Sequence, residues 1–294
     1  MKREVFDQFR LLAGSLGFKV KVFGEFDSPF GRLAADDCTR AGHLSAAFAD
    51  EEVAAIICAR GGYGSGRVLE HLPRSSFKDK ILVGYSDITA LMLHLQAQHG
   101  MITFHGPMAI DLVQKGNNDT LRWFLETLSG TRLSYVLGHE DYSIVRAGCA
   151  SGPIYGGNLS VLEAHIGTES MVVPEGIILL LEDVGEFMYS LDRSLVHIRR
   201  AGLLDRASGV VISDLRLKDG EGSDNSLGML LNDVLQYHFG AFHGPVVYGL
   251  PCGHTERQMT LPIGAHALLE VGRENMKISF ESFWENENSQ CIAA

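Results

Sequence analysis

The stretch Ile81-Leu82-Val83-Gly84-Tyr85-Ser86-Asp87-Ile88-Thr89 joins a short apolar run to the start of a helical pattern. Beyond it, apolar residues recur with the i, i+3, i+4, i+7 spacing of one helix face, at Ile88, Leu91, Met92 and Leu95. The stretch therefore predicts a strand, a sharp turn at Ser86 and a helix, which together form a repeating unit of α/β folds.

Ser86 has two interpretations at this turn. A serine between a strand and a helix holds its hydroxyl out of the sheet, close to unpaired backbone N–H groups, which suits a nucleophile whose attack creates an oxyanion. Serine is also a common helix N-cap. The pattern glycine-x-serine-x-glycine is incomplete, because Ile88 stands where the last glycine would be. The turn alone leaves both interpretations open.

The rest of the first half alternates helical patterns with short apolar runs. We expect helices over Phe6–Leu16 and Asp37–Phe48, and strands over Phe18–Phe23, Val53–Ala59 and Ile102–Phe104. This alternation predicts an α/β domain with a parallel sheet. The Val- and Ile-rich run over 53–59 is typical of a strand that is buried on both faces.

The loop Arg60-Gly61-Gly62-Tyr63-Gly64-Ser65-Gly66 follows that run and is rich in glycine. A phosphate-binding loop is one interpretation, but the spacing is not glycine-x-glycine-x-x-glycine and no glycine-lysine-serine or -threonine end is present. The alternative is an oxyanion loop, in which a backbone N–H points toward the Ser86 hydroxyl.

The second half is richer in strands and predicts a second domain. We place an α/β domain at residues 1–135 and a β-rich domain at residues 145–284. Strands are expected over Gly176–Leu181, Gly209–Ser213, Val246–Leu250, Ala265–Val271 and Lys277–Phe283, and helices over Asn158–Ile166, Met188–Leu203 and Leu227–Phe239.

Composition narrows the class of protein. The chain has 294 residues, of which 46% are hydrophobic and 21% charged, so a full core can be buried. The net charge of -11 argues against a nucleic-acid or anionic-membrane surface as partner. There is no apolar signal core and no run long enough to cross a bilayer. Five cysteines without metal or redox spacing favour reduced, mostly buried thiols, and hence a cytoplasmic protein.

A serine nucleophile needs a base, and the base needs an orienting group. Glu182 follows the apolar run Ile177–Leu181, and His254 lies in a loop after an expected strand. Strand ends and adjoining loops are where α/β enzymes place working groups, although each residue alone is also an ordinary strand-end or loop residue. The histidines His94, His99 and His105 match no standard metal-ligand spacing, so we expect no metal and no cofactor.

Six segments, in this order, resemble the LD-carboxypeptidase family of serine peptidases, which includes murein tetrapeptide carboxypeptidases and microcin C immunity peptidases. The resemblance spans roughly residues 5 to 280. The segments are Ala59-Arg60-Gly61-Gly62-Tyr63-Gly64, Gly84-Tyr85-Ser86-Asp87-Ile88-Thr89, His105-Gly106-Pro107-Met108, Gly156-Gly157-Asn158-Leu159, Leu181-Glu182-Asp183 and Gly253-His254.

The resemblance implies a serine–histidine–glutamate triad at Ser86, His254 and Glu182. It also implies an oxyanion hole from the backbone N–H groups of Gly62 and Asp87, and a site between an α/β and a β-rich domain. Family chains usually begin with a short strand before the first helix, whereas this chain starts inside that helix. We expect either a truncated start or a sheet that lacks one strand.

The implied substrate is a small peptide or muropeptide, and the implied reaction releases the terminal D-alanine of murein tetrapeptide. An immunity-type hydrolase of a peptidyl-nucleotide toxin is the alternative, which calls for an aromatic that stacks on a base; the only tryptophans are Trp123 and Trp284. A non-catalytic ligand-binding relative is a third hypothesis. The sequence leaves open whether the chain forms a homodimer.

A carboxypeptidase must hold a free C-terminal carboxylate, and an arginine fork is the strongest partner for it at neutral pH. Arg60 is the closest arginine in sequence to the expected oxyanion loop, and Arg67 and Arg257 are further candidates. We expect at least one of the three to face Ser86, and the alternative is that all three are solvated or paired with surface acids.

Overall fold

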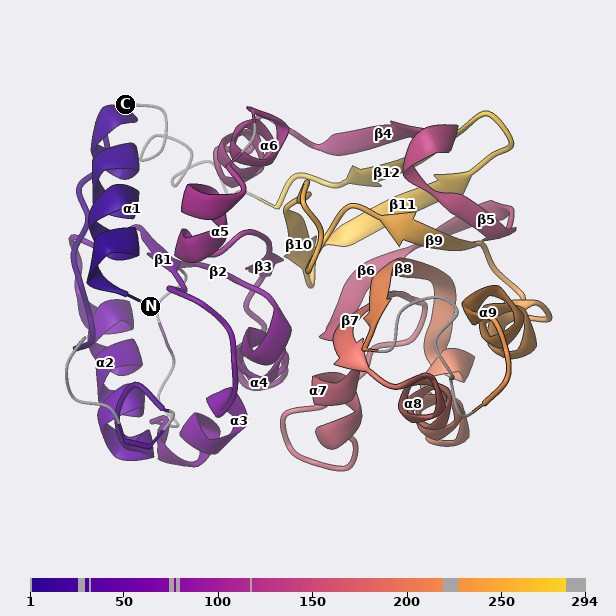
Figure 1. Cartoon of the computed structure of the whole chain (residues 1–294), viewed down its shortest axis with the longest axis horizontal. Coiled ribbons are helices and arrows are strands. Elements are labelled where there is room, and N and C mark those ends of the chain that lie inside the picture. Colours follow the sequence, from indigo (N-terminus) through magenta and orange to yellow (C-terminus); the bar gives the residue numbers. More distant parts are fainter. Residues whose placement is uncertain are drawn as a thin grey trace.

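Two sheets organise the part of the chain that the structure describes (Figure 1). This computed structural model describes residues 2–25, 30–31, 33–73, 77, 80–116, 118–218 and 227–283. The smaller sheet has the strand order β1-β2-β3-β10, and the larger has the order β4-β12-β11-β6-β7-β8-β9-β5.

The smaller sheet confirms the α/β pattern of the first half. Strand β2 (Ile81–Gly84) lies between β1 (Ala55–Ile57) and β3 (Thr103–His105) and is parallel to both. Strand β10 (Leu261–Ile263) comes from the second half of the chain and pairs antiparallel with β3. The helices of this part are α1 (Arg3–Ser15), α2 (Asp37–Ala49), α3 (Ser65–Val68), α4 (Thr89–His99), α5 (Ala109–Gln114) and α6 (Asn118–Leu128).

Two expectations about this sheet are wrong. Strand β1 is half-buried rather than buried on both faces, because it is the edge strand of the sheet. Residues 18–23 form no strand, although their alternating pattern suits one. An extended segment needs a ladder partner, and in the described residues β1 pairs only with β2.

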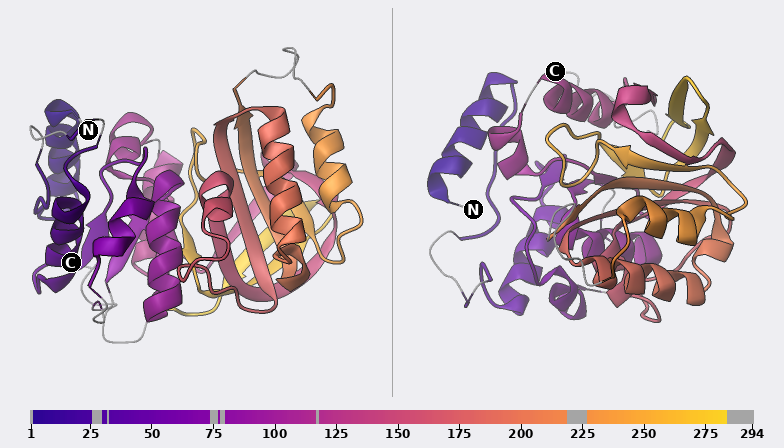
Figure 2. Two further views of the ribbon diagram at one scale, coloured as in Figure 1. Left: turned by 90° about the horizontal axis from the view of Figure 1, so that it is seen from below. Right: turned by 45° about the vertical axis from the view of Figure 1, so that its right-hand side comes forward.

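The larger sheet forms the β-rich second half (Figure 2). Within this sheet, the adjacent strands β6, β7, β8 and β9 run parallel to one another. The remaining strand pairs are antiparallel. The strands are β4 (Ser134–Gly138), β5 (Ser143–Arg146), β6 (Gly148–Asn158), β7 (Ile177–Glu186), β8 (Ala207–Leu217), β9 (Val246–Leu250), β11 (His266–Val271) and β12 (Asn275–Phe280). Helices α7 (Leu159–Ala164), α8 (Met188–Arg200) and α9 (Leu231–Phe239) cover one face.

Helix α4 stands between the two sheets. Its residues 89–95 are all buried, so it is covered on more than the single apolar face that the spacing predicts. It contacts β3 in the smaller sheet and β6 and α7 in the second half. A helix surrounded by protein has no need of a polar face, which explains its apolar sequence.

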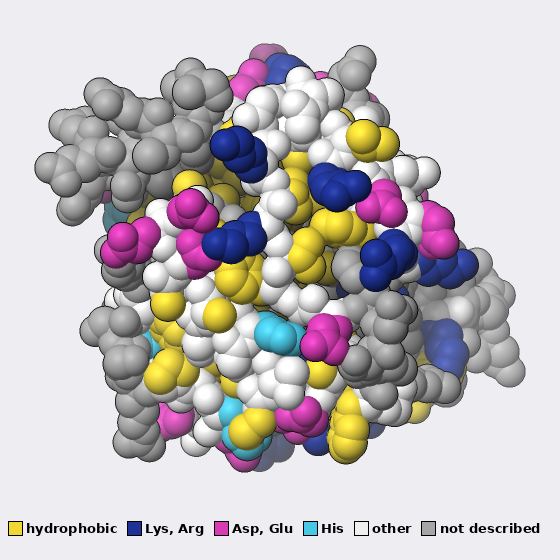
Figure 3. Space-filling view, turned by 90° about the vertical axis from the view of Figure 1, so that its left-hand side faces the viewer, with side chains coloured by type: hydrophobic (Ala, Val, Ile, Leu, Met, Phe, Trp, Pro, Cys, Tyr) yellow, Lys and Arg dark blue, Asp and Glu magenta, His cyan; other side chains and the backbone are white. Residues whose placement is uncertain are grey.

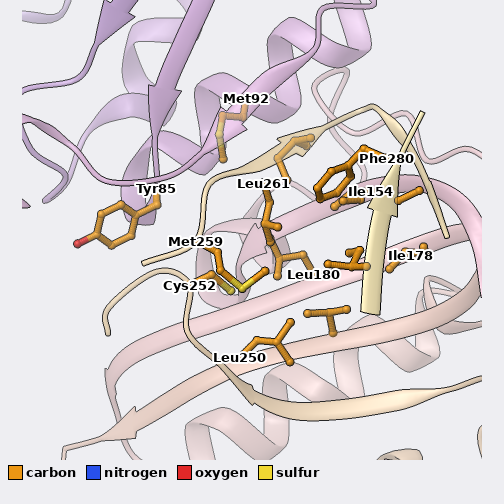
Figure 4. Packing of buried hydrophobic residues seen from close by; sticks show 14 of the residues in the cluster. Tyr85, Met92, Ile154, Ile178, Leu180, Leu250, Cys252, Met259, Leu261 and Phe280 are labelled. Carbon is orange, nitrogen blue, oxygen red and sulfur yellow. The ribbon is translucent and has the colours of Figure 1, made fainter. Parts of the chain in front are cut away.

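One hydrophobic cluster continues from the first half of the chain into the second (Figure 4). Met92 of α4 and Tyr85 belong to it, as do Leu180 of β7, Met259 and Leu261 of β10. The core is therefore continuous where the two halves meet. The division at residues 135 and 145 stays a prediction. Strands β4 and β5 of the larger sheet begin before residue 145, and β10 returns to the first sheet.

The surface carries both signs of charge. On the face seen in Figure 3, Lys and Arg side chains lie beside Asp and Glu side chains and hydrophobic ones. No helix among the described residues is both long and apolar enough to cross a bilayer. Cys38, Cys58, Cys149 and Cys252 are unpaired, and Cys291 lies outside the described residues. Of the four, Cys252 alone is buried, so the expectation of mostly buried thiols is wrong.

Candidate active site

Ser86 lies on a strained turn directly after β2. Its φ is 63°, and it is the only non-glycine residue with positive φ in the described part of the chain. Such a conformation costs an L-residue about 1–2 kcal/mol. The N-cap position before the short 3-10 turn Ser86–Ile88 belongs to Tyr85, and no side chain caps that turn. The N-cap interpretation of Ser86 is therefore wrong. Ser86 lies instead on a strained strand-to-helix turn, which we call the elbow.

Gly84 makes the elbow tight. A Cβ at this position would come within 2.7 Å of the Ile88 side chain, so the chain can fold back at this point only because glycine has none. The Ser86 hydroxyl makes no hydrogen bond to any described residue, which leaves it available to an incoming group.

The glycine-rich loop lies against Ser86. A Cβ on Gly61 would be 3.2 Å from Ser86 Oγ, and Gly62 has a φ of 134° that favours glycine. The Asp87 carboxylate fastens this loop to the elbow, because it accepts hydrogen bonds from Ser65 N at 2.8 Å and Ser65 Oγ at 2.7 Å. The Asp87 N–H belongs to the first turn after β2, where backbone donors lack intrahelical acceptors. The assignment of Gly62 and Asp87 as oxyanion donors stays a prediction.

Glu182 and His254 form a buried pair. His254 Nδ1 lies 2.7 Å from Glu182 Oε2, and the Glu182 side chain is fully buried inside β7. The strand continues to Glu186, and its buried part ends at Asp183, one residue after Glu182. Gly253 lets the two meet, because a Cβ there would be 2.8 Å from Glu182 Oε2.

Glu182 is held as an anion. Its burial raises the pKa, but His105 and His254 outweigh that effect and bring the pKa of Glu182 down to about 2. A carboxylate that is ionised at neutral pH accepts the Nδ1–H of His254 and fixes the tautomer whose Nε2 is free.

His254 also adjoins the elbow. The ring of Tyr85, the residue before Ser86, meets the His254 ring edge-on with centroids 4.9 Å apart. The His254 side chain is one-fifth exposed, so part of the imidazole reaches solvent. The structure thus brings Glu182 and His254 together beside the Ser86 turn. The structure shows no hydrogen bond between Ser86 Oγ and His254 Nε2. That the two atoms come within reach when a substrate binds stays a prediction.

Gln258 braces the loop that carries His254. Its side-chain amide donates to the carbonyl of Gly253 at 2.7 Å and to that of Thr255 at 3.4 Å, which flank His254 on both sides. Gln258 is fully buried, and its backbone N–H donates to the hydroxyl of Thr120 at 3.0 Å. The loop is therefore fixed from within the protein.

The three candidate arginines differ in their partners. Arg67 pairs with Asp37 at 2.6 Å, and Arg257 pairs with Asp141. Arg60 is exposed, and its one hydrogen bond to the described residues runs from Nε to the carbonyl of Gly61 at 3.2 Å. Arg60 is thus the least neutralised of the three and lies beside the loop that contacts Ser86.

The histidines His94 and His99 and the tryptophan Trp123 contact protein side chains. His94 binds Ser170 Oγ at 2.9 Å and His99 packs on Phe77, while no cluster of three metal-ligating side chains occurs among the described residues. Trp123 is buried and meets the Tyr135 ring edge-on, so it offers no face to a ligand. Trp284 lies outside the described residues.

Comparison with known proteins decides the family. A model of the LD-carboxypeptidase N-terminal domain matches residues 2–106, and a model of the LD-carboxypeptidase C-terminal domain matches residues 151–269. This chain belongs to the LD-carboxypeptidase family. The probable murein peptide carboxypeptidase of Bacillus subtilis is 31% identical over 92% of this chain and 86% of that protein.

Solved structures of similar proteins share the fold. The muramoyltetrapeptide carboxypeptidase of Oxalobacter formigenes is 27% identical, with a TM-score of 0.83 over 97% of each chain. The microcin C7 self-immunity protein MccF in complex with glutamyl sulfamoyl guanosine has the same TM-score over 96% of this chain and 93% of that one. At 21% identity, this second likeness shows the fold alone.

Sequence reasoning missed a polar network that joins α4 to β7 in this family member. Asn158 N donates to the Thr89 hydroxyl at 3.0 Å, and Asn158 Nδ2 donates to Asp183 at 3.1 Å. Asp183 also accepts from Ser160 N at 2.9 Å. These residues connect the helix after the elbow with the strand that carries Glu182. Asn158 and Asp183 stand in the segments that carry the family resemblance, which was the available signal.

Proposed function

We propose that the protein is a serine carboxypeptidase that hydrolyses the L,D peptide bond of murein tetrapeptide and releases its terminal D-alanine. The observation that carries the proposal is the Glu182–His254 hydrogen bond of 2.7 Å beside a serine with a φ of 63°. Ser86, His254 and Glu182 act as nucleophile, base and orienting acid in this proposal.

Acylation follows from the arrangement. Glu182 holds the Nδ1–H of His254, which leaves Nε2 to accept the Ser86 proton as Oγ attacks the scissile carbonyl. The buried anion then stabilises the imidazolium that forms. His254 returns the proton to the leaving D-alanine nitrogen, so that the C–N bond breaks and an acyl-enzyme remains.

The oxyanion is assigned to the N–H groups of Gly62 and Asp87. The contact between Gly61 and Ser86 supports this assignment, because it sets the loop beside the reacting hydroxyl. Loss of one such donor costs on the order of 3 kcal/mol in the transition state. Water activated by His254 then hydrolyses the ester, and Ser86 regains its proton.

Arg60 is assigned to the substrate carboxylate. Its exposed guanidinium forms no ion pair with a described carboxylate, whereas Arg67 and Arg257 are already paired. The overall charge of -11 disfavours an anionic peptide unless a cation receives it locally. The carboxylate would therefore bind at the glycine-rich loop.

The test is a mass-spectrometric assay of the purified protein with murein tetrapeptide and, separately, with a peptidyl-adenylate. We expect loss of one D-alanine from the tetrapeptide. Cleavage of the peptidyl-adenylate alone would assign the protein to immunity-type hydrolysis instead. Cleavage of neither would leave a ligand-binding relative.

Three variants test the assigned roles in the same assay. Ser86→Ala and His254→Ala should be about equally damaging, because triad members act as a unit. Glu182→Gln should be milder, because it removes the charge and keeps the shape. Full activity in Ser86→Ala would end the serine-peptidase proposal.

A further inference from the structure

His105 is buried beside the Glu182–His254 pair without a partner of its own. Its side chain is fully buried at the end of β3, and neither ring nitrogen has a hydrogen-bond partner among the described residues. Glu182 Oε1 is likewise buried and unpaired. His105 Nε2 and Glu182 Oε1 lie 3.9 Å apart, so two unsatisfied groups lie next to each other.

Their chemistry is complementary. A neutral imidazole carries one N–H donor, and a carboxylate accepts on both oxygens. Glu182 Oε2 already accepts from His254, which leaves Oε1 for a second donor. A buried donor and acceptor that stay apart each retain a desolvation cost. An approach of about 1 Å would bring them to ordinary hydrogen-bond distance.

The backbone holds His105 in place for this role. Strand β3 is paired on both sides, so that His105 lies opposite Gly84 of β2 and Leu261 of β10. The Tyr85 ring is 5.8 Å from the His105 ring. The backbone of His105 is therefore held by strand pairing in the smaller sheet, whereas Glu182 belongs to the larger sheet.

We propose that His105 is a positioning residue that donates its Nε2–H to Glu182 Oε1 and so aims Oε2 at His254. Glu182 is then held by two histidines, one from each side of its carboxylate. The proposal rests on the proposed triad, and it adds a contact by which the smaller sheet sets the direction of a carboxylate in the larger one.

The variants His105→Gln, His105→Asn and His105→Leu separate this role from packing. The Gln amide nitrogen can reach the place of Nε2, the Asn amide nitrogen reaches only the level of Nδ1, and Leu has no donor. With the peptide that the parent protein hydrolyses, His105→Leu and His105→Asn should lose kcat roughly 10- to 100-fold, as for one hydrogen bond to a charged group. KM should stay within about twofold, and His105→Gln should recover most of kcat, since the donor is restored. Equal kcat in the Gln and Asn variants would overturn the proposal.

A second measurement needs no substrate. The His254 Nδ1 proton in its hydrogen bond to Glu182 gives a low-field proton NMR signal, which we expect in the parent and in His105→Gln. We expect it to shift or disappear in His105→Asn and His105→Leu, with thermal unfolding confirming that each variant is folded. An unchanged signal in both would overturn the proposal. If no peptide is hydrolysed and the signal still responds, the proposed function fails while the role of His105 stands. If His105→Leu does not fold, the comparison of Gln with Asn decides.

Discussion

Gly253→Ala should damage both stability and catalysis, because Gly253 is the point at which the His254 loop passes Glu182. Gly253 has a φ of 76°, and an added Cβ would lie 2.8 Å from Glu182 Oε2 and 3.0 Å from its Cγ and Cδ. Glu182 is fully buried, so its carboxylate cannot move aside into solvent. The methyl group must therefore displace either the carboxylate or the His254 loop, and either shift disturbs the hydrogen bond between them.

The expected loss in the free energy of unfolding has two parts. The left-handed backbone costs alanine about 1–2 kcal/mol. Loss of the hydrogen bond between Glu182 and His254 adds about 1.5–3 kcal/mol, as for hydrogen bonds to charged groups. The free energy of unfolding should fall by about 2.5–5 kcal/mol in total. The same lost hydrogen bond should lower kcat about 10- to 100-fold.

Gly100→Ala is the matched control. Gly100 ends α4 with a φ of 64°, and a Cβ there would meet nothing within 4 Å. It should lose only the backbone contribution of about 1–2 kcal/mol and keep the parent kcat. Urea unfolding and steady-state hydrolysis of murein tetrapeptide measure both variants. Equal losses of kcat in Gly253→Ala and Gly100→Ala would refute the steric argument.

Three further outcomes are expected. A C-terminally amidated tetrapeptide should be a much poorer substrate than the free acid, and Arg60→Gln should raise KM for the acid more than Arg67→Gln does; equal cleavage of amide and acid would point to a broader hydrolase. Burial, with help from the Glu182 charge, raises the pKa of Asp183 from 3.8 to about 6. Between these two pH values the native state binds a proton that the unfolded chain has released. The free energy of unfolding should therefore decline as pH rises from about 4 to about 6. Urea unfolding across this range should show that decline in the parent but not in Asp183→Asn; parallel curves would contradict it. Dialysis against a chelator should leave the rate of hydrolysis unchanged, and a rate restored only by added metal would bring back a metal-dependent mechanism.

Much of the site could be predicted because its parts are local in sequence. The elbow at Ser86 follows from an apolar strand, a glycine and a helical pattern, and the structure contains all three. The pairing of Glu182 with His254 spans 72 residues, and it was predicted from the family resemblance, since spacing alone cannot bring distant residues together.

The errors in the predicted strands have physical reasons. Strand β6 contains Gly148, Gly152, Gly156 and Gly157, which in isolation indicate turns. Gly157 is needed where β6 approaches α4, because a Cβ there would be 2.7 Å from the Thr89 hydroxyl. The alternating residues 18–23 show the reverse case, in which a strand-like pattern finds no partner. Both errors arise because strands are defined by neighbours that lie far away in the chain.

Strand β10 has a consequence for how the protein is made. Strand β3 needs residues 261–263 as its antiparallel neighbour, although β3 itself ends at His105. During synthesis the smaller sheet stays open on that side until more than 150 later residues have been added. Ser86, which is synthesised early, therefore lies beside an incomplete sheet until β10 has been made. Such long-range closure is slow to form, and it makes completion of the sheet that carries the Ser86 turn depend on residues from the second half of the chain.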